Sequence, residues 1–396
     1  MIRRPPRSTQ SRSSAASDVY KRQGATTVGG IVGGSTALTS LSTNAGGTTQ
    51  IDGGGITTTG AQTYNDAVVL GANTTLNAGG GNISFASTVN ADAAANNRTL
   101  TLNSTGTTTL GGAVGGTQSL GSLITNAGGT TQINGGGVTT TGEQTYNDNV
   151  TLGANTTLTT TNSNVTFSGT VNGAQPLTIS VGTGLVSFGG AVGGGTALSS
   201  VSVTSTNGSA NAITLQNVTT TGAQTYTGNV TLGATTSLTT TSNGSISITG
   251  SVSGAQDLTL TANGTGTVSF EGDVTVGATA GGALSISAAS LSLGSGVDIS
   301  TAGVNGNISL TVDGLSLGGT NTINAGTGTF ALTPRTTTYT IEFSPTNTAL
   351  VTDVYYNSAF TGITAGAFRI GSAAHTGTIH VATAAMTPPY SPYRAE

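Results

Sequence analysis

Two carboxylates lie two residues apart at Glu271 and Asp273, and such a pair is what a polysaccharide-cleaving enzyme uses as general acid and base. Strand alternation would point both side chains to one face. A site of this kind also needs a basic group beside the acids, and the next basic residue in the sequence is Arg335. We therefore interpret the pair as solvated carboxylates and expect a non-enzymatic protein with no catalytic residues. The alternative is a carbohydrate-active enzyme, such as a polysaccharide lyase or hydrolase.

The other candidate metal ligands in the sequence do not indicate a metal site. Asp66 and Asp148 occupy equivalent places in a repeated block, where carboxylates can act as calcium ligands, but the third copy has Gly228 there. His375 and His380 are the two histidines, and no third ligand type lies near them in the sequence. The chain has no cysteine. We expect no metal site, no cofactor and no disulfide framework.

The repeated block is T-T-T-G-A-Q-T-Y-N-D-A-V-V-L-G-A-N-T-T-L, and it returns twice with three to five changes in twenty residues. The copies are residues 57–76, 139–158 and 219–238. Its tyrosine marks the period, at Tyr64, Tyr146 and Tyr226, with spacings of 82 and 80 residues. A second landmark, G-G-x-V-G-G, recurs at residues 29–34, 111–116 and 189–194. A fixed period of this length predicts an array in which each unit buries its apolar face against the next.

Short alternating strands lie between these landmarks, with Leu, Ile, Val or Phe flanking Ser or Thr, as in Ile83-Ser84-Phe85 and Val186-Ser187-Phe188. Recurring apolar positions 21 or 22 residues apart divide the repeat into about four coils of about twenty residues. Sparse charge and nearly absent proline suit stacked coils, because interior strands must donate hydrogen bonds on both sides. We predict an all-β fold, a parallel β-helix or β-solenoid, with roughly fifteen coils.

The three tyrosines have two readings. Four coils apart on one face, they could form a row that stacks against sugar rings. Alternatively, each ring packs at the edge of the core with its hydroxyl at the surface. We favour the structural interpretation.

Composition excludes several classes of protein. Charged residues make up 6% of the chain, against about 25% in ordinary domains. From residue 24 onward there are four basic and thirteen acidic residues, a net charge of −9. A nucleic-acid partner needs clustered Lys and Arg, so we expect none. No run of residues is apolar enough for a transmembrane helix. Disorder usually pairs low hydrophobicity with high net charge, and the strand alternation argues against it.

The chain divides by composition. Residues 1–23 are basic and serine-rich, and they lack the apolar segment of a signal peptide. They resemble a translated sequencing-adaptor sequence, so we interpret them as a non-native or disordered leader; a transit peptide and a basic nucleic-acid arm are the alternatives. We expect a β-solenoid array at 24–332, divergent coils at 333–387 and a disordered tail at 388–396.

Three phrases carry a family resemblance: the repeated block, V-N-G-A-Q-P-L-T-I at 171–179 and G-A-F-R-I-G at 366–371. They resemble the repeat regions of filamentous-haemagglutinin-like and autotransporter-type adhesins. The resemblance implies a right-handed parallel β-helix in a large exported bacterial protein, of which this chain is a fragment. It also implies a place at the outer-membrane-associated cell surface, with an export partner. The implied role is that of an elongated stalk or an adhesive surface in cell adhesion or biofilm formation, with surface glycans or proteins of a host or the environment as partners.

Overall fold

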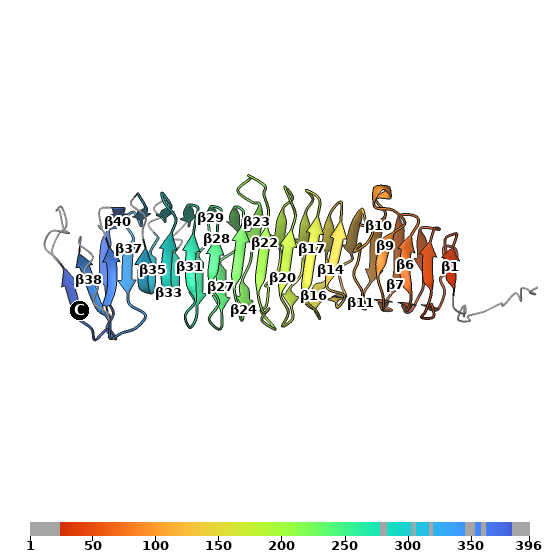
Figure 1. The fold of residues 1–396 in the computed structure, drawn as a ribbon, viewed down its shortest axis with the longest axis horizontal. Helices are drawn as coiled ribbons and strands as arrows, with labels where there is room; N and C mark the ends of the chain where they lie inside the picture. Colours follow the sequence, from red (N-terminus) through yellow and green to blue (C-terminus); the bar gives the residue numbers. More distant parts are fainter. Residues whose placement is uncertain are drawn as a thin grey trace, which may run out of the picture.

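The protein is an elongated stack of parallel β-strand coils, seen in a computed structural model that describes residues 24–277, 283–301, 303, 306–316, 320–344, 353–357 and 362–381 (Figure 1). About 14 coils of roughly 22 residues follow one another from β1 at one end to β38 near the other. The β-strand pairings that tie each coil to the next are parallel. The predicted all-β solenoid is confirmed. The predicted leader, 1–23, and tail, 388–396, lie outside the described residues.

Each coil has three faces, and the strands of one face pair with those above and below. The first face contains β1 (Ala25–Val28), β3 (Thr48–Ile51), β6 (Ala67–Leu70), β9 (Val89–Ala91), β14 (Gly137–Thr140), β17 (Thr156–Thr160), β20 (Leu177–Ser180), β22 (Val201–Thr204), β25 (Gln224–Thr227), β28 (Ile246–Ile248) and β31 (Thr267–Phe270). The second face contains β4 (Gly55–Thr57), β7 (Thr74–Gly79), β10 (Thr99–Ser104), β12 (Ser122–Thr125), β15 (Gln144–Tyr146), β18 (Val165–Phe167), β21 (Val186–Phe188), β23 (Ile213–Leu215), β26 (Val230–Leu232), β29 (Val252–Gly254), β32 (Val274–Val276), β34 (Asp298–Ser300), β36 (Thr322–Asn324) and β40 (Ile363–Thr364). The third face contains β2 (Leu41–Ser42), β5 (Gln62–Tyr64), β8 (Ile83–Phe85), β11 (Thr107–Leu110), β13 (Thr130–Ile133), β16 (Asn149–Leu152), β19 (Val171–Asn172), β24 (Val218–Thr220), β27 (Thr236–Thr240), β30 (Leu258–Ala262), β37 (Thr329–Thr333) and β41 (Ala367–Ile370).

Toward the C-terminus the boundary between two faces changes. Strands β33 (Leu284–Leu293) and β35 (Ile308–Ser316) run on from the third face into the first without a break. The first face then continues through β39 (Asp353–Asn357), β38 (Thr340–Ser344) and β42 (Ile379–Val381).

Alternation builds the core. In β17, β20 and β22 the inward residues Leu158, Ile179 and Val203 stack directly on one another, and all are fully buried. The Ser and Thr residues between inward positions face outward, where a β-branched side chain suits the pleated surface. Aromatic rings stack in the same way: Tyr146 and Phe167 have ring centroids 5.0 Å apart and an interplanar angle of 13°. The core is therefore one continuous column along the rod.

The coils are longer than the predicted twenty residues. Paired residues of adjacent coils are 19 apart at Ile133 and Leu152 but 25 apart at Phe85 and Leu110. Strand lengths also differ between these two coils, but most of the difference lies in the corners, such as the excursion at 92–98. A strand pattern alone underestimates the coil because it does not count the corners.

The repeat does not contain four coils. From β5 to β15 the chain passes through eleven strand positions, counting the single bridging residue Val114, and four three-faced coils would need twelve. The same count, with Val192 as the bridging residue, leads from β15 to β25. Each copy of the block therefore lies one face away from the previous copy. β5 is on the third face, β15 on the second and β25 on the first.

The G-G-x-V-G-G landmark is a face reduced to one residue. Val114 alone bridges Val89 below and Val138 above, and it is fully buried. The next residue, Gly115, has φ +67°, and a Cβ built there would lie 2.0 Å from the carbonyl oxygen of Thr139 in the following coil. Glycine lets the chain turn here at close approach.

Candidate functional site: the repeated corner and the acidic side chains

Each copy of the block forms the same buried hydrogen-bond network, which we call the Gln–Tyr corner: the glutamine and tyrosine of Q-T-Y with the threonine four residues before the glutamine. In the second copy, Gln144 Nε2 lies 3.1 Å from the Val138 carbonyl oxygen, 3.0 Å from the Thr159 carbonyl oxygen and 3.2 Å from Thr140 Oγ1. The Tyr146 hydroxyl donates to Gln144 Oε1 over 3.0 Å. The amide thus uses both its donor and its acceptor capacity inside the rod.

The first and third corners match the second. The tyrosine hydroxyl donates to the glutamine Oε1 at 2.9 Å in the Tyr64–Gln62 pair and at 3.0 Å in the Tyr226–Gln224 pair. In every copy the threonine hydroxyl donates to the carbonyl oxygen of the glycine two residues later, as Thr140 does to Gly142 over 2.6 Å. The network satisfies buried polar groups at the point where the chain turns from one face to the next.

Both readings of the tyrosines are corrected by the structure. All three are 0% exposed, so their hydroxyls lie in the interior and not at the surface. They are also on three different faces, so they form no row. Burial raises the pKa of each of the three hydroxyls far above its ordinary value. Sequence reasoning did not identify Gln144 as the hydrogen-bond partner of the Tyr146 hydroxyl. The signal was its place two residues before Tyr146, which puts both side chains on the same side of the strand.

The copies of the block differ almost entirely on the outside of the rod. The buried threonine, glutamine, tyrosine, valine, leucine, threonine and leucine are identical in all three copies; in the first copy they are Thr58, Gln62, Tyr64, Val68, Leu70, Thr74 and Leu76. Of the seven positions that change, six are exposed or half-buried in every copy; in the first copy these are Ala61, Asn65, Ala67, Val69, Asn73 and Thr75. The seventh is the aspartate at Asp66. The repetition therefore preserves an interior.

The recurring aspartate holds a tight loop. Asp148 is 2% exposed, its Oδ1 accepts the Gly129 N–H over 2.8 Å, and its Oδ2 accepts the Thr131 hydroxyl over 3.1 Å. Asp66 likewise accepts the Thr49 hydroxyl, at 3.4 Å. In the third copy, the corresponding corner, between β22 and β23, is the longer segment 205–212, compared with 126–129 in the second copy. In this third copy Gly228 replaces the acid. The acid thus accompanies the short loop.

Burial raises the pKa of the Asp148 carboxyl. The folded chain therefore holds a carboxylate that ionises less readily than in the unfolded chain, and this penalty is present at neutral pH and lost as the pH falls below about 4. For Asp148→Asn we expect the free energy of unfolding, taken relative to that of the parent chain, to be highest at pH 7 and to decrease on acidification. Denaturant unfolding at several pH values checks this, and a relative free energy that increases toward acid pH would contradict it.

The acid pair lies at a corner between β31 and β32. Glu271 and Asp273 are exposed, and Asp273 Oδ1 accepts the backbone N–H of Asp298 in the next coil over 2.9 Å. Corner asparagines make the same contact, as Asn164 does with the N–H of Leu185. Arg335 donates instead to the carbonyl oxygens of Ala262 and Gly264. Within the described ranges no ion pair links a basic residue to the acid pair.

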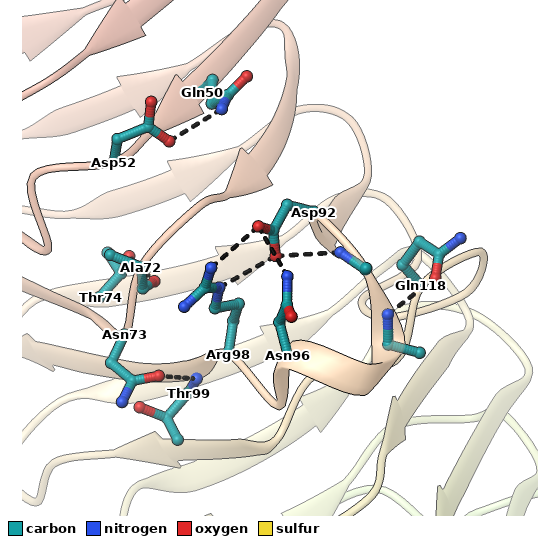
Figure 2. A network of polar contacts seen from close by, with 12 residues as sticks. Gln50, Asp52, Ala72, Asn73, Thr74, Asp92, Asn96, Arg98, Thr99 and Gln118 are labelled. Carbon is teal, nitrogen blue, oxygen red and sulfur yellow. Dashed lines mark hydrogen bonds and ion pairs between the residues drawn. The ribbon is translucent and has the colours of Figure 1, made fainter.

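The sequence analysis did not predict one charged cluster, formed by Asp92 and Arg98. Arg98 clamps Asp92 with two hydrogen bonds, Nε to Oδ1 and Nη2 to Oδ2, each 3.0 Å (Figure 2). The Asn96 side chain and the Ala93 N–H also donate to this carboxylate, across the short 3-10 helix η1 (Ala94–Asn96). These donors hold the pKa of Asp92 well below its usual range, and its carboxylate raises the pKa of Arg98. Every Asp92 oxygen is engaged, so the cluster orders the excursion at 92–98.

The two histidines have different surroundings. The ring Nε2 of His375 lies 2.7 Å from the carbonyl oxygen of Tyr339. His380 is in β42, paired with Glu342 of β38, and its side chain lies outside the described part of the chain. In the part that the structure describes, no three side chains of the His, Cys, Asp or Glu type gather as a metal site would require.

No protein-family model, curated protein or solved structure matches the chain. Among the described residues, no helix is long and apolar enough to cross a membrane.

Proposed function

We propose that this chain is a non-enzymatic repeat region of a large exported bacterial surface adhesin, in which it serves as an elongated stalk that presents other regions. One observation carries the proposal: seven buried side chains are identical in all three copies of the block, whereas six of the seven positions that change are exposed or half-buried. Selection for a recurring binding surface would produce the opposite pattern, with outward residues kept and inward ones free to vary among apolar types.

The rotation of the repeat supports the same role. The outward threonines of the three Q-T-Y strands are Thr63, Thr145 and Thr225, and they lie on three different faces. A flat partner along one side of the rod can therefore contact only one of them. The coils add length at about 4.8 Å each, giving a rod on the order of 65–70 Å. Each added coil makes the rod longer, but the rotation of the repeat prevents equivalent outward residues from forming one continuous binding face.

Adhesion, export and the cell surface enter the proposal through the family resemblance of the repeat phrases. The partners we propose are glycans or proteins on a host or environmental surface, reached by regions that the stalk carries, together with an export partner. The net charge of −9 from residue 24 onward argues against a nucleic-acid partner.

The test separates a stalk from an enzyme. The full chain is incubated with a panel of acidic and neutral polysaccharides, and chain length and newly formed reducing or unsaturated ends are measured. We expect no turnover. Cleavage of any polysaccharide that is lost on Glu271→Gln or Asp273→Asn would instead establish the carbohydrate-active enzyme.

A second arm tests reach. Beads carry the full chain with a short affinity peptide at its C-terminus, and capture of the peptide's receptor from a surface covered by a polymer brush is measured. We expect capture to fall when whole coils are deleted and to be unaffected by Thr145→Ala on the outer surface. Capture that depends on Thr145 but not on length would contradict the stalk.

A further inference from the structure

Asparagine–glycine steps recur at the corners of the rod. Five of them lie in the described residues: Asn134-Gly135, Asn172-Gly173, Asn207-Gly208, Asn243-Gly244 and Asn263-Gly264. In such a step the asparagine side chain can lose ammonia to attack by the next backbone nitrogen, because glycine has no side chain to shield that nitrogen and turns easily toward it. The five steps share this chemistry, and the fold decides where it can proceed.

Four of the steps are packed against a neighbouring coil. A Cβ built on Gly135, Gly173 or Gly244 would lie 2.0 to 2.3 Å from a backbone atom of that coil. One built on Gly264 would lie 1.9 Å from Oδ1 of Asn243. Gly135 and Gly173 also donate their N–H groups to carbonyl oxygens of other coils, over 2.9 and 3.3 Å. The backbone rotation that ring closure needs would displace the neighbouring coil at each of these steps.

Gly208 is free of such packing. It is exposed, and a Cβ built there would meet nothing within 4 Å. Among the described residues, its N–H has no hydrogen-bond partner. It belongs to the long corner 205–212 between β22 and β23. Its nitrogen can therefore approach the Asn207 side chain without moving another coil.

Ser209 activates the Asn207 amide. Asn207 Oδ1 accepts the Ser209 N–H over 2.8 Å and the Ser209 hydroxyl over 2.6 Å. Asn207 Nδ2 donates to the Thr183 carbonyl oxygen over 2.6 Å, which fixes the rotation of the amide. From the next coil, Asn229 donates to the carbonyl oxygens of Gly208 and Ser209 and holds the corner in place. Two donors on one oxygen stabilise the negative charge that develops there when the carbonyl carbon is attacked.

We propose that Asn207-Gly208 is a self-modifying site, which converts to aspartate and isoaspartate in the folded protein with Ser209 as the oxyanion donor. The Gly208 nitrogen gives its proton to water or hydroxide and forms a bond to Cγ of Asn207. The bond from Cγ to Nδ2 breaks, and ammonia leaves a five-membered succinimide ring. Water then adds to either ring carbonyl and opens the ring, and no oxidant or reductant is needed.

The corner tolerates both products. Thr183 is exposed, so water can replace the donor that its carbonyl oxygen loses with Nδ2. Isoaspartate adds one carbon to the main chain, and the corner 205–212 is an excursion with free space around Gly208. We therefore expect the modified chain to keep its stacked fold.

The chain contains its own control, because Asn243-Gly244-Ser245 repeats the tripeptide Asn-Gly-Ser. There the glycine is buried, and Asn243 Oδ1 accepts the N–H of Thr265 in the next coil over 3.0 Å. The Ser245 hydroxyl oxygen accepts the N–H of Thr267 instead of serving the amide. A difference in rate between the two tripeptides must come from the fold.

The full chain, residues 1–396, is incubated at mildly alkaline pH, and peptide mass spectrometry follows deamidation and isoaspartate at each step. We expect Asn207 to react about tenfold faster than Asn243 in the folded chain, and the two to react at similar rates in concentrated urea. Equal rates in the folded chain, or a difference that persists in urea, would overturn the proposal.

Two variants test the named roles. Ser209→Ala removes one donor, and we expect the folded-state rate at Asn207 to fall about tenfold, less than the roughly hundredfold effect of a donor in a water-excluded enzyme site. Ser245→Ala is the matched control and should leave the rate at Asn243 unchanged. Gly208→Ala shields the nitrogen and should slow the reaction with an unchanged melting curve. A parent-like rate at Asn207 in Ser209→Ala or in Gly208→Ala would contradict the proposal.

Discussion

Replacing Gln144 by leucine is expected to lower the free energy of unfolding of the surrounding coils by about 3–5 kcal/mol, because each buried polar group left without a partner costs about 1–3 kcal/mol. Leucine fills much of the same volume, but it leaves the Tyr146 hydroxyl without an acceptor and two buried carbonyl oxygens without this donor. In a stacked array the loss is local, so amide hydrogen exchange in β14 to β18 is the measurement.

The double variant Gln144→Leu/Tyr146→Phe is the control for this result. It removes the hydroxyl together with its acceptor, so we expect it to be more stable than Gln144→Leu alone. Gln62→Leu and Gln224→Leu should show the same loss, because their contacts match. A loss below about 1 kcal/mol in all three would mean that the corners contribute little.

Gly115→Ala should be strongly destabilising, as should the equivalent change at Gly193, where a Cβ would lie 2.0 Å from the Thr219 carbonyl oxygen. The φ of +67° at Gly115 disfavours any side chain, and the new Cβ would lie 2.0 Å from the Thr139 carbonyl oxygen, which the next coil holds in place. Strain at a left-handed position costs on the order of 1–3 kcal/mol, and the clash adds to it, so we expect about 4 kcal/mol or more. Thermal and denaturant unfolding of the full chain measure this.

Gly208→Ala is the matched comparison. Gly208 lies in the segment 205–212, where a Cβ would meet nothing within 4 Å. There we expect a change within about 0.5 kcal/mol of zero. Equal losses at Gly115 and Gly208 would show that the close approach between coils does not decide the effect.

The fold could be predicted from the sequence because the alternation of apolar and polar residues along each strand indicates which side chains point inward. Ile83-Ser84-Phe85 and Val186-Ser187-Phe188 read as strands with one buried face, and both are strands. The number of coils per repeat could not be predicted in the same way. It depends on corner lengths, which vary between the excursion at 92–98 and two-residue turns elsewhere, and alternation says nothing about corners.

The candidate site was less predictable than the fold. Tyr146 was expected at the core edge because tyrosine usually keeps its hydroxyl in water. The overlooked signal was Gln144, a polar residue on the inward side of an alternating strand, which only a buried partner can satisfy. The Asp92–Arg98 clamp depends on the excursion folding back on itself, and opposite charges six residues apart do not reveal that.

The most direct test of the rotating repeat is a set of three distances. Cysteines replace Thr63, Thr145 and Thr225, the outward residues of the three Q-T-Y strands, in pairs, and spin labels on them are measured by pulsed electron paramagnetic resonance. On three different faces, the 63–225 distance is clearly shorter than the sum of the 63–145 and 145–225 distances. A 63–225 distance equal to that sum would place all three copies in one row and contradict the rotation.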